Sequence, residues 1–342
     1  MTTDTAARPP DHPPVAFGRV GVLLVNLGTP DATDFWSVRR YLSEFLSDRR
    51  VVELPRLLWQ PILQGIILTT RPRRSGHAYA QIWDRSRNQS PLKSITEDQA
   101  AALQALLGPD VDVDWAMRYG NPSIAGRLTA MKARGCDRIL IAPLYPQYSG
   151  ATTASVVDKV GEAMMAMRWQ PALRTLPPYY DDPGYIAALA GSVRARINTL
   201  DWEPEVLLAS FHGMPRRTLD LGDPYHCHCQ KTGRLLREAL DWPAARFHIT
   251  FQSRFGRAEW LRPYTDQTLR ALAGKGVKRL AIIAPAFTAD CIETLEELSL
   301  ANRDLFLSHG GEAFAYVPCL NAGSDGMAML AGLVRRELQG WI

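Results

Sequence analysis

Short apolar runs alternate along this chain with segments of helical periodicity. The runs that resemble β-strands span residues 20–26, 111–118, 138–143, 205–211, 247–252 and 277–285, with a weaker one at 313–317. Between most of them lie helical patterns at 95–107, 124–134, 153–167, 185–198, 233–239 and 266–275. Strands that alternate with helices form parallel sheets whose two faces are covered by those helices. The predicted fold class is therefore α/β.

A faint internal repeat divides the chain. Residues 128–143 and 269–285 both run from a helical pattern through a glycine and a basic residue into an apolar strand that ends in proline. We therefore expect two similar Rossmann-like lobes, each a parallel sheet flanked by helices, facing each other across a cleft. The first lobe is predicted to comprise residues 18–170 and 321–342, and the second residues 171–320.

Composition excludes several classes of function. Of the 342 residues, 46% are hydrophobic and 22% are charged, as in soluble globular proteins. The net charge of +4 is too small to indicate a nucleic-acid partner, and no nucleic-acid motif is present. The five cysteines are an odd number without a secretory signal, which favours a reducing, cytoplasmic setting. Residues 1–17 are polar and proline-rich, so we expect a disordered tail there.

Carboxylates gather within residues 290–297, shortly after the apolar strand 277–285. Asp290, Glu293 and Glu297 are spaced three and four apart, which places them on one face of an α-helix. The pattern Asp290-x-x-Glu293 is also that of a capping box, which serves only to begin a helix. Because ligands of open α/β sheets bind at the carboxyl ends of the strands, a site that handles cations or protons is the second interpretation.

A histidine stands at another strand end. His212 follows the apolar run 205–211, and a glycine and a proline come shortly after it. A neutral imidazole there could face the cleft as a base or a metal ligand, whereas a purely structural histidine fits the position equally well. The loop 143–153 is expected to complete the wall of the cleft.

An apolar segment at 57–68, within a broader lip at about 45–75, is flanked by arginines on both sides. It is too short to span a membrane and is interrupted by glutamine, proline and glycine. Such a segment can rest on a membrane surface or form an apolar lip at a pocket mouth. A core helix with solvated ends is the alternative.

The sequence His226-Cys-His-Cys229 looks like a metal motif. Its ligands alternate so closely that they do not easily surround one tetrahedral ion. It is predicted to lie at the junction of a loop with the helix 233–239. A packing cluster is the simpler interpretation, and a secondary metal site is the alternative.

Ten motifs in consistent order carry a resemblance to a known family. They include Val25-Asn-Leu-Gly-Thr-Pro-Asp31, Phe45-Leu-Ser-Asp-Arg49, Met117-Arg-Tyr-Gly120, Tyr145-Pro-Gln-Tyr-Ser149, Ser210-Phe-His-Gly-Met-Pro215, Phe251-Gln-Ser-Arg-Phe-Gly256 and Phe287-x-x-Asp-Cys-Ile-Glu-Thr-Leu-Glu-Glu297. With these motifs the chain resembles ferrochelatase over nearly its whole length after the tail. The resemblance implies a chelatase-like fold with a porphyrin cleft. It also implies a lyase that inserts Fe2+ into protoporphyrin IX, releases two protons and forms protohaem, the terminal step of haem biosynthesis.

The resemblance also implies roles for single residues. His212 matches the active-site histidine and Glu293 the carboxylate paired with it, and both are candidates for contacting the iron. Glu297 and Asp290 match acidic residues that extend from that carboxylate. We expect His212 to accept protons while Glu293 assists and partly ligates iron, although the sequence does not separate the two roles. The positions matched to porphyrin contacts are Leu27, Arg118, Tyr119, Tyr145, Ser210 and Trp260.

Some positions depart from family patterns. Relatives with a two-iron sulfur cluster have a cysteine after the Tyr-Pro-Gln-Tyr-Ser loop, where this chain has Gly150, and no cysteine follows Cys319. We therefore expect no cluster and no permanently bound cofactor, since Fe2+ is a substrate. Relatives that act on coproporphyrin have tyrosine at the position of Leu27, so leucine favours protoporphyrin IX. The lip is expected to give weak peripheral contact with the inner face of the membrane.

Two other functions compete with this one. A porphyrin carrier on the same scaffold would need the apolar pocket but not His212, Glu293 and Glu297 together. A chelatase that inserts cobalt or nickel into another tetrapyrrole would be shorter and would lack the motifs at 145–149 and 251–256.

Overall fold

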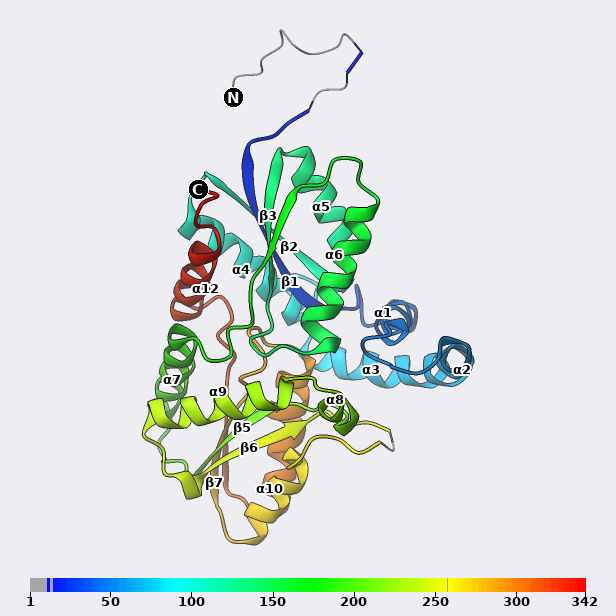
Figure 1. Cartoon of the computed structure of the whole chain (residues 1–342). Helices are drawn as coiled ribbons and strands as arrows, with labels where there is room; N and C mark the ends of the chain where they lie inside the picture. The colour runs from blue at the N-terminus through cyan, green and yellow to red at the C-terminus, as the bar shows by residue number, and fades with distance from the viewer. Residues whose placement is uncertain (1–10, 13–14, 257) are drawn as a thin grey trace.

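A computed structural model describes residues 11–12, 15–256 and 258–342 of the chain. Most of the tail predicted at 1–17 lies outside the described residues. Figure 1 shows two lobes stacked end to end, with strands through the middle of each lobe and helices beside them. No helix in the described part of the chain is long and apolar enough to cross a membrane.

The first lobe is built on a four-stranded parallel sheet. Its strands are β1 (Arg19–Thr29), β2 (Val111–Gly120), β3 (Cys136–Pro143) and β4 (Ala172–Thr175), in the order β2-β1-β3-β4. The interior of β1 is buried on both faces, which is why it reads as a continuous apolar run. Helices α4 (Pro91–Leu107) and α12 (Ser324–Glu337) pack together on one side, and α5 (Ile124–Ala133) and α6 (Ser155–Met165) pack together on the other (Figure 1).

The second lobe repeats this topology. Its strands are β5 (Val206–His212), β6 (Phe247–Gln252), β7 (Arg279–Ile283) and β8 (Ala313–Val317), in the order β6-β5-β7-β8. Its main helices are α7 (Pro183–Ile197), α9 (Tyr225–Leu240), α10 (Thr265–Gly274) and α11 (Arg303–Ser308), with a short α8 (Arg216–Asp220) and a 3-10 turn at Ala244–Arg246. Gly135 before β3 and Gly276 before β7 both have positive φ, +95° and +91°, which L side chains rarely adopt. The predicted α/β class and the two similar sheets are confirmed.

An arm of helices projects from the first lobe (Figure 1). It comprises α1 (Phe35–Ser47), α2 (Arg56–Ile62), a π-helical segment (Leu63–Ile67) and α3 (Leu68–Ile82). The arm has a small apolar cluster of its own, in which Val38, Leu63 and Leu68 are fully buried. Other apolar side chains of the arm face solvent, and Leu57 is 90% exposed. The arm contains the predicted lip, and the alternative of a core helix is wrong for α2, which has no buried residue.

Some elements differ from their predicted bounds. Strand β4 pairs with β3 in the first sheet, so the boundary predicted at residue 170 falls before it. Its residues are half-buried or exposed, which explains why no apolar run marked it. Helix α9 begins at Tyr225, directly after Pro224, and the Tyr225 backbone N–H donates to Asp223. The His226–Cys229 motif therefore lies inside this helix and not at a loop junction.

Candidate active site

One cavity lies where the loops after four strands meet. These strands are β1 and β3 in the first sheet and β5 and β7 in the second. Within each sheet the two strands are neighbours, and the direction in which the chain adds strands to the sheet reverses between them. Ligands of open α/β sheets bind at such reversals. Five of the predicted site residues line the cavity, namely Leu27, Tyr145, His212, Trp260 and Glu293.

Apolar side chains form most of the cavity wall. Phe45 and Val51 come from the arm, and Leu92, Met214 and Phe287 come from elsewhere in the two lobes. No lysine or arginine is found among the described residues of this lining. A wall of this kind suits a flat apolar ligand, and it leaves only a few polar groups to act on it.

His212 is held in one orientation at the end of β5. Its Nδ1 lies 2.6 Å from the carbonyl oxygen of Gly213. Since a carbonyl oxygen only accepts, Nδ1 carries the hydrogen and Nε2 of the neutral ring keeps its lone pair. The backbone is fixed as well, because the Tyr225 hydroxyl donates to the His212 carbonyl at 3.0 Å. A Cβ at residue 213 would lie 2.5 Å from the Gln252 carbonyl oxygen, so glycine is required beside the histidine.

Glu293 and Glu297 lie in the first half of a π-helical segment, Glu293–Asn302, which we call the acidic helix, and Asp290 precedes it. Glu293 lines the cavity, and its backbone carbonyl accepts a hydrogen bond from Gln252 Nε2 at 2.9 Å. Glu297 lies behind it, on an adjoining cavity that it shares with Gln252 and Trp260. The Ser253 backbone N–H donates to Glu297 at 2.8 Å, and the Ser253 hydroxyl donates a second, short hydrogen bond. Burial raises the pKa of Glu297, although Ser253 and the neighbouring His212 partly oppose that rise.

Asp290 points elsewhere. Its buried carboxylate accepts hydrogen bonds from Tyr316 Oη at 2.5 Å, Asn321 Nδ2 at 2.7 Å and Thr294 Oγ1 at 3.0 Å. It does not line the cavity. The capping-box interpretation is wrong, since the N-cap residue is Ile292 and the Asp290 carboxylate accepts from the three side chains above and not from the backbone of this helix. Asp290 lies before the first helical residue, so helical spacing does not set the direction of its side chain, whereas the wide turn of the π-helix keeps Glu293 and Glu297, four apart, on one face.

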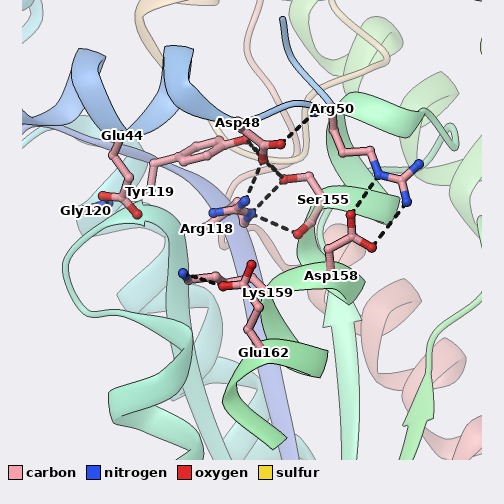
Figure 2. A network of polar contacts seen from close by, with 10 residues as sticks. All are labelled: Glu44, Asp48, Arg50, Arg118, Tyr119, Gly120, Ser155, Asp158, Lys159 and Glu162. Carbon is pink, nitrogen blue, oxygen red and sulfur yellow. Dashed lines mark hydrogen bonds and ion pairs between the residues drawn. The ribbon is translucent and has the colours of Figure 1, made fainter. Parts of the chain in front are cut away.

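Arg118 and Tyr119 also lie outside the cavity lining. Figure 2 shows both side chains directed at Asp48, at the end of α1. Asp48 Oδ2 accepts hydrogen bonds from Arg118 at 2.5 Å, Tyr119 Oη at 2.7 Å and Ser155 Oγ at 2.5 Å. Burial raises the pKa of Tyr119 well above its usual range. These residues join the arm to the first sheet instead of forming the pocket wall.

Ser210 lies behind the residues that line the cavity and is not part of the lining. Its hydroxyl is buried and donates to Gln252 Oε1 at 2.8 Å, and it shares a second hydrogen bond with Thr265. Gln252 in turn contacts Glu293 and Glu297, so it links β5 and β6 to the acidic helix. Sequence reasoning did not single out Gln252, although it lies in the motif 251–256.

Comparison with known proteins identifies the family. The family model described as Ferrochelatase matches residues 19–338. The chain belongs to the ferrochelatase family. A ferrochelatase of Rhizobium meliloti is 60% identical over 97% of this chain and 98% of its own length. Ferrochelatases of Agrobacterium fabrum and Methylocella silvestris are each 57% identical over the full length of both chains.

Solved structures support the fold. SirB from Bacillus subtilis with Fe3+ superposes with a TM-score of 0.57 over 94% of this chain and 97% of its own, at 11% identity. A sirohydrochlorin chelatase SirB in complex with cobalt gives a TM-score of 0.53 at 10% identity, with the same coverage. At such low identity the likeness concerns the fold alone. The ferrochelatase family inserts iron into a porphyrin in haem synthesis, and this chain is accordingly a lyase, as the resemblance predicted.

The His226–Cys229 motif has packing contacts. The His228 ring stacks on Tyr180 at 3.6 Å between centroids, and its Nδ1 accepts from the Tyr148 backbone N–H. Cys229 is buried, whereas Cys227 is exposed. No group of three or more His, Cys, Asp or Glu side chains in the described part of the chain is placed to hold a metal ion.

Proposed function

We propose that His212 accepts the pyrrole protons during insertion of Fe2+ into protoporphyrin IX. The observation that supports this role is the contact between Nδ1 and the Gly213 carbonyl, which leaves Nε2 as the acceptor. Two of the four porphyrin nitrogens carry weakly acidic protons, and both must leave as the metal enters. A fixed acceptor beside the macrocycle assists that departure at the moment it occurs.

Glu293 is proposed to assist His212 and to contact the iron transiently. Ferrous iron accepts mixed imidazole and carboxylate ligands, and a site that must release its metal works best with few of them. Glu293 lines the same cavity as His212. Glu297, on the adjoining cavity, would exchange protons with solvent or lead the cation inward. Burial raises the pKa of Glu297, which favours its protonated form.

The remaining residues divide into two groups. Leu27, Tyr145 and Trp260 are proposed to contact the macrocycle directly. The buried hydroxyl of Tyr145 has no hydrogen-bond partner among the described residues, so it is free to donate to a ligand. Asp290, Arg118, Tyr119 and Ser210 are proposed to position the site through the contacts given above. An apolar wall that includes Leu27 favours protoporphyrin IX over a porphyrin with four carboxylate side chains. Protoporphyrin IX has only two, and both can extend to solvent.

The test is anaerobic haem formation from Fe2+ and protoporphyrin IX, followed by absorbance. We expect many turnovers per molecule in the wild type. His212→Ala should lose turnover by about two orders of magnitude or more while porphyrin still quenches protein fluorescence with similar affinity. Lost porphyrin binding with normal turnover per bound complex would contradict the role of His212. Stoichiometric binding without metallation in the wild type would favour a carrier.

A second proposal concerns the arm. Leu57, Leu58, Ile62 and Ile66 are exposed on it, and two exposed arginines, Arg56 and Arg73, flank this stretch in the sequence. We infer that these side chains enter the interface of an anionic membrane, weakly and reversibly, on the cytoplasmic side. Sedimentation with vesicles of phosphatidylglycerol and phosphatidylcholine should recover the wild type. Leu57→Glu with Leu58→Glu should stay in the supernatant, and Leu221→Glu, an exposed leucine outside the arm, serves as the control. Equal sedimentation of both variants would exclude docking through the arm.

The expected absence of an iron–sulfur cluster stays a prediction. Gly150 occupies the position at which relatives with a cluster have a cysteine. Its backbone N–H donates to Asp223 Oδ2 at 2.7 Å. Iron analysis of the purified protein, before Fe2+ is added, tests it.

A further inference from the structure

One glutamine connects the first lobe to the segment that carries the acidic helix. Gln99 lies on α4 and is only 2% exposed. Its Nε2 donates to two backbone carbonyl oxygens that are distant in sequence, Thr288 at 3.2 Å and Asn321 at 3.0 Å. Thr288 belongs to the cavity wall, five residues before Glu293. A side chain of the first lobe therefore helps to hold part of the wall contributed by the second sheet.

The two segments held by Gln99 also fix Asp290. Asn321 donates its backbone N–H to the Thr288 carbonyl at 2.9 Å. Its side chain accepts from the Asp290 backbone N–H at 2.8 Å and donates to the Asp290 carboxylate at 2.7 Å. The hydrogen bonds thus run from Gln99 through Asn321 and Asp290 to the beginning of the acidic helix.

A small cavity completes this junction. The amide orientation of Gln99 is fixed by its two carbonyl acceptors, so Oε1 must find a donor elsewhere. Gln99 Oε1 and the hydroxyl of Tyr179 are both buried without a partner among the described residues. Both residues line one small space of about 10 Å³, which is the room that one water molecule needs. The Tyr179 hydroxyl can donate to that water, and the water can donate to Gln99 Oε1.

We propose that Gln99 is a positioning residue for iron insertion, and that one water between Gln99 and Tyr179 completes its hydrogen bonds. The proposal rests on the proposed function of Glu293. Leu27 and Tyr145 reach the macrocycle from the first sheet, whereas Glu293 reaches it from the segment after β7. Gln99 sets the distance between these two walls together with the Thr288 hydroxyl, which donates to the Leu144 carbonyl at 3.1 Å. A reacting group displaced by about 1 Å can lose a large part of the rate, so loosening this junction lowers kcat more than binding.

The decisive comparison uses two glutamines of the same helix. Gln99→Leu removes the hydrogen bonds between the walls while keeping a similar volume. Gln104→Leu removes bonds of the same kind within the first lobe, where Gln104 contacts Gly108, Val111 and Val113 at 2.7 to 2.9 Å. We expect kcat to fall on the order of tenfold in Gln99→Leu, with the KM for porphyrin changed less than about twofold. Gln104→Leu should keep the wild-type kcat.

Equal kcat values in the two variants would overturn the positioning role. Should Gln99→Leu fail to fold, Tyr179→Phe tests the same junction, because it removes only the donor to the water. A high-resolution crystal structure of the wild type should show one ordered water within hydrogen-bond distance of both Gln99 Oε1 and Tyr179 Oη. An empty cavity there would overturn the water site. Glu293→Gln separates the two proposals, since full turnover in that variant refutes the role of Glu293, whereas wild-type kcat in Gln99→Leu refutes only the role of Gln99.

Discussion

The buried carboxylate of Asp48 offers the sharpest test of how the arm is held (Figure 2). The side chains of Asp48 and Arg118 are only 8% and 10% exposed, and their charged atoms are 2.5 Å apart. Asp48→Asn keeps the shape of the side chain but leaves the Arg118 guanidinium buried without a counter-charge. Breaking a buried pair in this way costs about 3 to 5 kcal/mol of the free energy of unfolding.

The matched control lies on the same segment of chain. Arg50 and Asp158 form an ion pair at 2.8 Å, but their side chains are 47% and 49% exposed. Water screens this pair, so Asp158→Asn should cost less than about 1 kcal/mol. Urea unfolding of the wild type, Asp48→Asn and Asp158→Asn measures the loss of stability in each variant. The comparison holds when the free energy of unfolding falls with urea concentration at the same slope in all three proteins. Trypsin cleavage after Arg49 should also accelerate in Asp48→Asn, because the arm would loosen at that point.

The difference in free energy of unfolding between the wild type and Asp48→Asn should change with pH in one definite direction. Burial alone would raise the pKa of Asp48, but hydrogen bonds from Ser155 and Tyr119 and the nearby Arg118 outweigh it and hold the pKa below its usual value. The stabilisation is therefore present above the unfolded-state pKa, about 3.9, and is lost as the pH falls through the folded-state pKa. The advantage of the wild type over Asp48→Asn should shrink in acid. A cost below about 1 kcal/mol at pH 7, or a cost independent of pH, would refute the reasoning.

Two further predictions concern groups whose pKa is raised by burial. Because the pKa of Glu297 is raised, its contribution to stability is present below about pH 4.3 and lost as the pH rises through the folded-state value. The Tm of Glu297→Gln relative to that of the wild type should therefore rise between pH 4 and pH 8, while the variant loses turnover. A Tm difference that does not change with pH would contradict this prediction. Burial also raises the pKa of the Cys229, Cys291 and Cys319 thiols and raises that of Cys136 to about 12, whereas Cys227 is exposed. Maleimide should thus label Cys227 first, as peptide mass spectrometry can check, and faster labelling of Cys291 would show that the cavity opens to solvent.

The strands were predictable because buried strands consist of continuous apolar runs in the sequence. The interior of β1 is covered on both faces, so its apolar residues run without interruption. The half-buried edge strand β4 leaves no such trace, and α9 was shortened because its first turns carry the polar residues of the His226–Cys229 motif. The likeness of the stretches before β3 and β7 was enough to predict two similar sheets, and both sheets have the same strand order.

Contacts between distant segments were not predictable in the same way. Nothing in the sequence near Arg118 indicates that its partner is Asp48, 70 residues earlier. Arg118 was predicted as a porphyrin contact from the family resemblance alone, and a sequence motif does not reveal the partner of a side chain. Gln252 was overlooked for a related reason. It does not titrate, and its importance lies in linking Ser210 to the acidic helix, which only the folded chain brings together.

The acidic helix shows where reasoning from spacing reaches its limit. The prediction that Asp290, Glu293 and Glu297 share one face assumes the turn of an α-helix. Residues Glu293–Asn302 instead form a π-helix, whose hydrogen bonds span one residue more. A wider turn keeps Glu293 near the direction of Glu297, four residues on. Asp290 precedes the first helical residue, and its carboxylate is directed at Asn321 and Tyr316 by hydrogen bonds. Other π-helical segments of the described chain, Leu63–Ile67 and Gly150–Ala154, also border the cavity or its arm. Because such turns are stable only within a tertiary structure, the direction of a carboxylate in this site is decided by its packing and not by its position in the sequence.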